Sequence, residues 1–443
     1  MNFVTWLFTN TPLKFFVQSF WRDEAFTYLL SIKSIPVITN LTAQDFNPPL
    51  YYWLMHFWIK LFGKSEIILR LPSLIFFCAT VYIAYLILIE VFKINWKIVF
   101  VLLIAFILNP SLHYYAFETR MYSMMVFFIT LSYYALFKKQ WRLYTFTVIF
   151  GLYTHYFAFF AIVAQLTGEW LVKKDYKIMR ELFHRIVYIA LIYLPWIVYL
   201  VISHDLPPQS FWITSPNLST WINLPTIIYS GFERELNLKV SLWLFNIVMS
   251  SFILMNLIIF RKKAIIKKNS LTEQSIITHL CLWTFLSPLI LLIISFFYPI
   301  FLPRYFLYCT VGLLLLIIKL TNHSPKLLTL VLLIVSIIST NQYIHQQVTI
   351  RTKFNLRKTI TSIKKISRPS DLLFVDHEFN YHVAQYYFPA NRVFILGKTY
   401  EEIPVYVGKI LIPKSAIATQ IPIYPDRAFL LKESGEYSII SQE

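Results

Sequence analysis

The chain of 443 residues is 57% hydrophobic and 18% aromatic, while only 14% of its residues are charged, against roughly 25% in soluble domains. This composition is typical of an integral membrane protein and excludes an ordinary soluble enzyme. The formal net charge of +18 would suit nucleic acid, anionic lipid or cytoplasmic loops, so the position of the charges along the chain decides among them.

The first apolar stretch, residues 3–20, is interrupted by Asn10, Thr11, Pro12 and Lys14. It lacks the basic start and clean apolar core of a cleavable signal peptide. We expect either a short, distorted first span or an amphipathic helix that lies in the membrane interface.

A pair of carboxylates, Asp23 and Glu24, opens the first long polar loop. Asp45 and Asn47 follow, and after a Pro-Pro corner comes an aromatic segment, residues 50–62. That segment predicts an amphipathic helix along the membrane surface. Asp45 and Asn47 either shape a substrate pocket or start this helix, because both residue types are good N-caps.

Nine longer apolar runs follow, at 69–92, 98–116, 121–137, 143–167, 186–203, 238–260, 276–297, 305–320 and 326–343. Most approach the roughly 20 residues that a helix needs to cross the hydrocarbon core. Basic residues gather in every second connection, including Lys93, Lys138, Lys173 and Arg261, as in cytoplasmic loops. The positive charge is therefore topological, which argues against nucleic acid as a partner, and we predict a multi-pass protein of the cell membrane.

The alternate connections, which we expect on the outer face, hold the remaining polar candidates. Glu118, Arg120 and Tyr122 share one such connection, and Arg304 and Tyr305 stand at the end of another. Two guanidinium groups at outer helix ends suit a phosphate, which they can bind with bidentate hydrogen bonds. The alternatives are a local Glu118–Arg120 ion pair and an arginine that reaches to the lipid headgroups.

His155 lies within the run 143–167, between Thr154 and Tyr156. It is either a phosphate or metal ligand or a hydrogen-bonding core residue. The three cysteines all lie inside apolar runs without paired spacing, which predicts neither a disulfide framework nor a zinc site.

Hydrophobicity falls near the end of the chain, and we predict a membrane domain at 1–343 and a soluble α/β domain at 344–443. Apolar segments predict strands at 371–375, 392–396 and 409–412 and a helix at 379–388. Counting spans places this domain outside the cytoplasm, since long domains translocate largely regardless of their charge.

The order of these motifs resembles the GT-C superfamily of membrane glycosyltransferases, especially its protein O-mannosyltransferase and aminoarabinose-transferase-like branch (families 39 and 83). The matching elements are the Asp23-Glu24 pair, PPLYY at 48–52, LFGKSE at 61–66 with Arg70, YYAFETRMY at 114–122, YTHY at 153–156 and PRY at 303–305. The resemblance covers roughly residues 20–320. It implies an all-α polytopic membrane fold of about ten to eleven transmembrane helices, with interface helices in the first outer loop.

The resemblance also implies an activity: transfer of a sugar from an undecaprenyl- or dolichyl-phosphate donor to an acceptor hydroxyl outside the membrane, with inversion. Asp23 would be the general base. The candidate site residues are then Asp23, Glu24 and Glu118 for catalysis, Arg120, Arg304, Tyr305 and His155 for the lipid phosphate, and Asp45, Asn47 and Tyr122 for the substrate pocket. The expected partners are membrane lipids, the lipid-linked sugar donor, and an acceptor glycan, lipid or protein.

Two departures from the family matter for this expectation. The first span is weak, and Asn47 stands where similar proteins often carry histidine. We therefore predict no obligatory metal or other cofactor, and leave open a divalent cation held by Asp23, Glu24 and Glu118.

Other functions fit a polytopic chain too. A transporter or flippase usually places ionisable residues near the bilayer midplane, whereas Glu90 and Glu169 lie near predicted inner ends here. A non-catalytic scaffold could bind a partner through its C-terminal domain. A lipid-linked polymer ligase or polymerase would depend on the loop 203–237.

Overall fold

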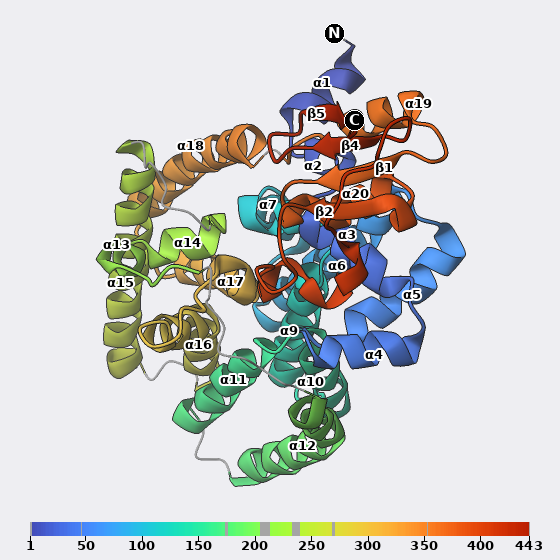
Figure 1. Cartoon of the computed structure of the whole chain (residues 1–443). Coiled ribbons are helices and arrows are strands. Elements are labelled where there is room, and N and C mark those ends of the chain that lie inside the picture. Colours follow the sequence, from blue (N-terminus) through green and yellow to red (C-terminus); the bar gives the residue numbers. More distant parts are fainter. Residues whose placement is uncertain are drawn as a thin grey trace.

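The computed structural model describes residues 2–45, 47–172, 176–203, 213–232, 240–267, 271–351 and 353–442. A mostly helical part is followed by a small mixed sheet at the C-terminus (Figure 1), which confirms the predicted fold class. Asp205 and Glu233–Glu235, the charged residues of the loop predicted to serve a polymer ligase, lie outside the described residues.

The N-terminal region consists of short helices: α1 (Phe3–Asn10), α2 (Lys14–Val17), α3 (Arg22–Ser31), α4 (Ile35–Ala43) and α5 (Leu50–Phe62). Residues 3–20 thus form two short helices with a break at Pro12, because proline has no N–H to donate and its ring clashes with the preceding turn. A helix is confirmed at the bounds predicted for the interface helix, and its location at the membrane surface stays a prediction. One face of α5 buries Tyr51 and Tyr52, while Leu61 is exposed.

The longer helices are α6 (Glu66–Leu86, continued by a π-helical turn Ile87–Val91), α7 (Trp96–Ile107), α8 (Pro110–Ala116), α9 (Tyr122–Phe137), α10 (Trp141–Thr154), α11 (Ala158–Val172), α12 (Tyr176–Ser203), α15 (Val240–Lys267), α16 (Leu271–Ile294), α17 (Tyr308–Thr321) and α18 (Lys326–Ile350). Short helices α13 (Leu218–Ile222) and α14 (Leu224–Ser230) and a 3₁₀ turn (Pro303–Phe306) lie between them.

Fewer helices than predicted are long enough to cross a membrane. Within the described residues, five are long and apolar enough, and α7 with α8 makes a sixth if this pair, bent by 71°, is one span. Three shorter apolar helices, α9, α11 and α17, accompany them. The predicted ten to eleven transmembrane helices are therefore not all of spanning length, because several apolar runs are interrupted.

The predicted run 143–167 is the clearest such case, since it is two helices, α10 and α11. His155 ends α10 with an extended backbone, and its Nδ1 accepts the N–H of Phe157 at 3.2 Å. No proline marks this break, so hydropathy alone predicted one helix. The break leaves His155 buried beside other outer-end residues.

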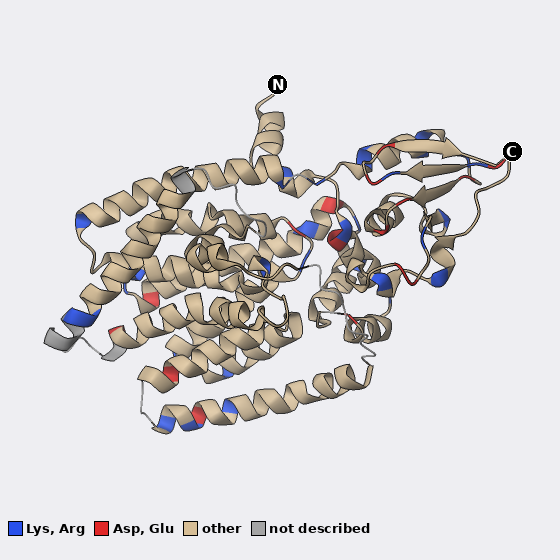
Figure 2. Ribbon diagram, turned by 60° about the vertical axis from the view of Figure 1, so that its left-hand side comes forward, with Lys and Arg blue, Asp and Glu red and all other residues tan. Residues whose placement is uncertain are grey.

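The charges follow the predicted arrangement of loops. Many of the Lys and Arg positions gather at the left-hand ends of the long helices in Figure 2, away from the C-terminus. Glu90 is at such an end, where it pairs with Lys138 at 2.7 Å. The pattern is the one expected of cytoplasmic helix ends, and the side of the membrane itself stays a prediction.

The C-terminal domain has a five-stranded sheet in the order β3-β2-β1-β4-β5. Its elements are α19 (Leu356–Ile366), β1 (Leu372–Val375), α20 (Tyr381–Tyr387), β2 (Val393–Leu396), β3 (Ile417–Ala418), β4 (Ala428–Leu431) and β5 (Tyr437–Ile440). Strands β1 to β4 are parallel, and β5 is antiparallel to β4. The first two predicted strands and the helix are confirmed.

The predicted third strand at 409–412 is wrong. Lys409–Leu411 is a 3₁₀ turn, since Gly408 with φ +83° precedes it and Pro413, which cannot donate to a ladder, follows. Helix α18 also continues to Ile350, beyond the boundary predicted at residue 343.

The C-terminal domain packs directly on α3, as the neighbouring red and blue ribbons of Figure 1 show. Phe26 of α3 meets His382 of α20 with ring centroids 5.7 Å apart, and Tyr28 meets Tyr386 at 5.0 Å. The N–H of Phe20 donates to Oη of Tyr387 at 2.9 Å. The helix that carries Asp23 and Glu24 is thus covered by residues from the far end of the chain.

Gly408 gives a test of this packing. A Cβ at Gly408 would lie 2.5 Å from Cδ2 of Phe26, whereas one at Gly397 would meet nothing within 4 Å. Both glycines have positive φ, so either alanine costs about 1–2 kcal/mol of backbone strain. Only Gly408→Ala should also disturb the packing of the C-terminal domain on α3. We therefore expect a lower unfolding temperature and faster proteolysis for Gly408→Ala than for Gly397→Ala. Equal behaviour of the two variants would contradict the packing on α3.

Candidate active site

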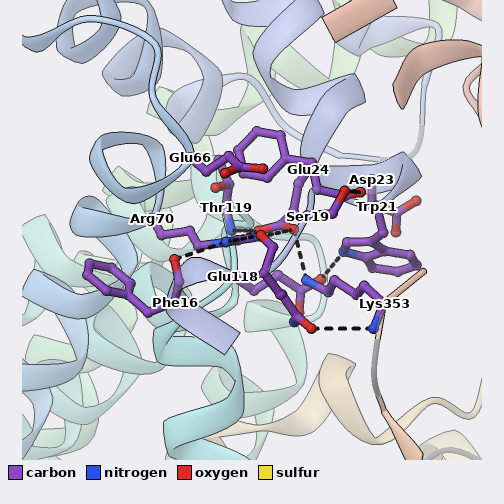
Figure 3. Close-up of polar contacts among 12 residues, drawn as sticks. Phe16, Ser19, Trp21, Asp23, Glu24, Glu66, Arg70, Glu118, Thr119 and Lys353 are labelled. Carbon is purple, nitrogen blue, oxygen red and sulfur yellow. Dashed lines mark hydrogen bonds and ion pairs between the residues drawn. The ribbon is translucent and has the colours of Figure 1, made fainter. Parts of the chain in front are cut away.

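Glu24 is the centre of a buried ionic cluster (Figure 3). Arg70 donates to both of its oxygens, from Nε to Oε1 at 2.8 Å and from Nη2 to Oε2 at 2.7 Å. Lys353 Nζ reaches Oε2 at 2.8 Å from the opposite side, and the N–H of Thr119 donates to Oε1 at 3.1 Å. The side chains of Glu24 and Arg70 are both 0% exposed, so this is a charge pair removed from water.

The same cluster joins distant segments of the chain. Arg70 also donates from Nη1 to the carbonyls of Phe16 and Gln18 at 3.0 and 2.8 Å. The cluster therefore fixes α3 to α6, to the segment before α3, to the loop after α8 and to the segment after α18. Because both oxygens of Glu24 are engaged, we assign Glu24 to holding these elements rather than to proton transfer.

Opposite effects act on the pKa of Glu24. Burial raises the pKa, but the charges of Arg70 and Lys353 and their hydrogen bonds outweigh it, so the pKa is lowered. Glu24 is ionised at neutral pH, as a bidentate arginine partner requires.

Asp23, the preceding residue of α3, has a different environment. Arg22 Nε donates to its Oδ1 at 3.0 Å, while its other oxygen takes no hydrogen bond within the described part of the chain. Burial raises the pKa of this carboxyl, but Arg22, Arg120 and Arg304 outweigh burial and hold the pKa below its ordinary value. Asp23 is therefore an ionised carboxylate, and one of its oxygens accepts no hydrogen bond among the described residues.

Arg120 and Arg304 both lie next to the ring of Tyr122. Their guanidinium carbons are 5.8 and 6.0 Å from the centroid of the Tyr122 ring, and both side chains are buried. Nε of Arg120 has no hydrogen-bond partner among the described residues. Two buried guanidinium groups close to one another are suited to bind an anionic ligand.

His155 and Tyr305 complete this group. The ring of His155 lies 5.9 Å from Tyr122 and 5.4 Å from Tyr305. Since its Nδ1 accepts the N–H of Phe157, its proton belongs on Nε2, which has no partner among the described residues. His155 thus presents a buried donor beside the two arginines, and the structure brings together five residues that the sequence placed in distant segments.

Glu118 lies between this group and the Glu24 cluster. Its Oε1 accepts Nε1 of Trp21 at 2.8 Å, and Oε2 has no partner among the described residues. Burial raises the pKa of Glu118, and although Lys353 lowers it, the pKa stays above its ordinary value. The hydrogen bond of Glu118 to Trp21 thus favours this partner over the local pair with Arg120.

The remaining candidates lie on the loop between α4 and α5. The charge of Asp45 acts on the buried hydroxyl of Tyr52, as do those of Asp23 and Arg120, so Asp45 belongs to the same surroundings. Helix α5 is capped by Pro49 without a side-chain bond, so neither Asp45 nor Asn47 starts it. Asn47 is partly buried in the turn before this helix.

No group of three or more His, Cys, Asp or Glu side chains in the described ranges could hold a metal ion. Glu24 uses both oxygens for Arg70, Lys353 and Thr119, which removes it from the cation site left open above. That no metal or other cofactor is required stays a prediction.

Sequence analysis missed three residues of this region. Arg22, the direct partner of Asp23, and Lys353, a partner of Glu24, were not singled out, and Arg70 was noted only as part of a motif. A search for a cation to neutralise each carboxylate would have suggested Arg22 and Arg70. Nothing in the sequence singles out Lys353 among its basic neighbours.

Comparisons with known proteins were made on sequence and on structure. No protein-family profile matches the sequence, and no curated protein is significantly similar to it. The fold is similar to crystal structures of ArnT from Cupriavidus metallidurans, one in the apo state and one bound to undecaprenyl phosphate. Both are 9% identical and cover 96% of this chain and 90% and 91% of theirs, with TM-scores of 0.49 and 0.47.

Arg70 provides a test of the buried cluster. Arg70→Met leaves Glu24 with Lys353 as its counter-charge, and removing one partner of a buried ion pair costs about 3–5 kcal/mol. Arg185→Met removes an ion pair with Glu181 in which both side chains are partly exposed. Loss of such a pair lowers the free energy of unfolding by about 0–1 kcal/mol. We expect thermal unfolding in detergent to show a clear loss for the first variant only. Similar drops in unfolding temperature in both variants would contradict a larger contribution of the Glu24 cluster to stability.

Proposed function

We propose that this chain is an integral membrane glycosyltransferase that moves a sugar from a polyprenyl phosphate to an acceptor hydroxyl on the outer face of the membrane. The observation that carries the proposal is one ionised carboxylate, Asp23, beside two buried arginines, Arg120 and Arg304. Transfer from a phosphate needs a base on one side and cations on the other. This group supplies both at the ends of apolar helices.

The two arginines and His155 suit the phosphate of the donor. A leaving phosphate already carries a stable negative charge, so it needs cations and hydrogen-bond donors more than an acid. Arg120 Nε and His155 Nε2 are buried donors without partners in the described structure. Tyr122 and Tyr305 place aromatic surface between and beside these donors, where the sugar or the lipid head could pack.

Asp23 acts as the general base in the proposed reaction. The acceptor oxygen attacks the anomeric carbon and its proton passes to Asp23, while the bond from that carbon to the phosphate oxygen breaks and the lipid phosphate leaves. Attack opposite the leaving group inverts the anomeric centre. Before the donor binds, the arginines hold the pKa of Asp23 low. The donor phosphate would offset their charge, so that Asp23 gains proton affinity only when a donor is present.

A transporter is the second candidate, favoured by one contact. Glu169 of α11 is buried 3.4 Å from Nε2 of His279 on α16, and an ionisable pair inside apolar helices is typical of transport pathways. Accumulation of a lipid-linked sugar in proteoliposomes, without release of lipid phosphate, would favour this function over transfer.

Asp23 gives the first test of the proposed function. In lipid-reconstituted protein supplied with radiolabelled polyprenyl-phosphate sugars, we expect Asp23→Asn to release free lipid phosphate about 10²- to 10⁴-fold more slowly, the usual share of a general base. Glu90→Gln, at the opposite helix ends, should match the parent. Release by Asp23→Asn at the parental rate would refute the base assignment, and no release by the parent with any sugar would refute the activity.

Arg120 gives a test through pH. Since Arg120 lowers the pKa of Asp23, Arg120→Met should raise that pKa. The base must be ionised, so activity is lost as the pH falls through its pKa, and this loss should begin at a higher pH in the variant. Profiles of kcat/KM against pH would measure the shift, with the exposed Arg142→Met as control. If the loss of kcat/KM at low pH began at the parental pH in Arg120→Met, Arg120 would not control the pKa of Asp23.

A further inference from the structure

The segment between the last membrane helix and the C-terminal domain enters the candidate site. Lys353 belongs to this segment, and its side chain is only 7% exposed. The ammonium group contacts Glu24 at 2.8 Å and lies 5.5 Å from the centroid of the Trp21 ring. Trp21 in turn donates to Glu118, so one cation from residue 353 faces two buried carboxylates from the first two outer loops.

The surrounding contacts fix where Lys353 can lie. Just before it, Arg351 lies over the rings of Tyr114 and Phe232 at 4.7 and 4.8 Å. The N–H of Lys353 itself donates to Oε1 of Gln18 at 3.3 Å. The contacts of Arg351 and of the Lys353 N–H therefore fix the position of this segment, so that the ammonium group of Lys353 lies next to Glu24.

The loop that follows α8 depends on the groups that Lys353 contacts. The N–H of Thr119 donates to Glu24, and Ser73 Oγ donates to the carbonyl of Glu118 at 2.6 Å. The N–H of Arg120 also donates to that carbonyl, at 2.7 Å. Arg120 thus follows directly after Thr119, which Glu24 holds, and its N–H is bonded to the same Glu118 carbonyl that Ser73 holds.

We propose that Lys353 is a positioning residue of the active site, which holds Glu24 and Glu118 and, through them, the loop that presents Arg120. This inference rests on the proposed function for the role of Arg120, and on the contacts above for the link to Lys353. The C-terminal segment thereby completes a site whose other residues come from the membrane part.

The charges around Glu118 make the link measurable. Burial raises the pKa of Glu118, and the charges of Glu24 and Asp23 raise it further, while those of Lys353 and Arg304 lower it. The charge of Glu118 in turn raises the pKa of the Tyr51 hydroxyl. Without Lys353 the pKa of Glu118 should rise further. If Glu118 must be ionised to hold the loop, activity will then be lost at a higher pH as the solution is acidified.

The test compares Lys353→Met and Lys353→Arg with a matched control, Arg357→Met. Arg357 lies in the first turn of α19, directly after this segment. It also contacts the membrane part, where it pairs with Glu66 and donates to the carbonyl of Val17. We expect Lys353→Met to slow lipid phosphate release at least about tenfold, with the acid limb of kcat/KM moved to higher pH. Lys353→Arg should recover much of the rate, and Arg357→Met should keep the parental pH profile.

Two results would overturn the proposal. One is a parental rate and pH profile for Lys353→Met. The other is an equal change in Lys353→Met and Arg357→Met, which would reduce Lys353 to a contact that merely docks the domain.

A second measurement needs no activity. Losing the cation beside Glu24 costs stability at any pH at which Glu24 is ionised, and it costs more while Glu118 is ionised too. The drop in unfolding temperature of Lys353→Met should therefore be larger above the pKa of Glu118 than below it. The exposed Lys358→Met should show no drop at either pH. A drop independent of pH would refute the link between Lys353 and Glu118. If the parent releases no lipid phosphate, the proposed function fails, and this measurement still decides whether Lys353 controls Glu118.

Discussion

The charge of Glu24 is the constraint on which the rest of the structure depends. A carboxylate with no exposure to water is tolerated only with close counter-charges and hydrogen bonds, and Glu24 obtains them from Arg70, Lys353 and the N–H of Thr119. Each of these partners lies on a different segment. Satisfying one buried charge therefore requires α3, α6, the loop after α8 and the start of the C-terminal domain to meet at one point.

This arrangement explains how two adjacent carboxylates have different roles. Successive residues of an α-helix point about 100° apart, so when Glu24 is fixed towards Arg70, Asp23 is turned towards Arg22 and the two buried arginines. One carboxylate stabilises the helix that presents the other. Asp23 and Glu24 also both lie in the first turn of α3, where the helix dipole stabilises negative charge.

The sequence predicted best what depends on local pattern. Helix α5, strands β1 and β2, and the grouping of Asp23 with Arg120 and Arg304 were all within reach, because hydrophobic periodicity and the outward position of alternate loops limit where these residues can lie. The break at His155 was not, since an extended backbone inside an apolar run leaves no sign in hydropathy. Lys353 was hidden as well, because one buried lysine looks the same as its solvated neighbours until the docking of the domain is known.

The distance in sequence between Glu24 and Lys353 also sets an order of events during synthesis. The ribosome makes α3 long before it makes the segment after α18, so Glu24 first enters its environment without one of its two cations. The cluster closes only once the last membrane helix has been inserted and the linker behind it has been made. A nascent chain thus carries an incomplete ionic centre through most of its biogenesis.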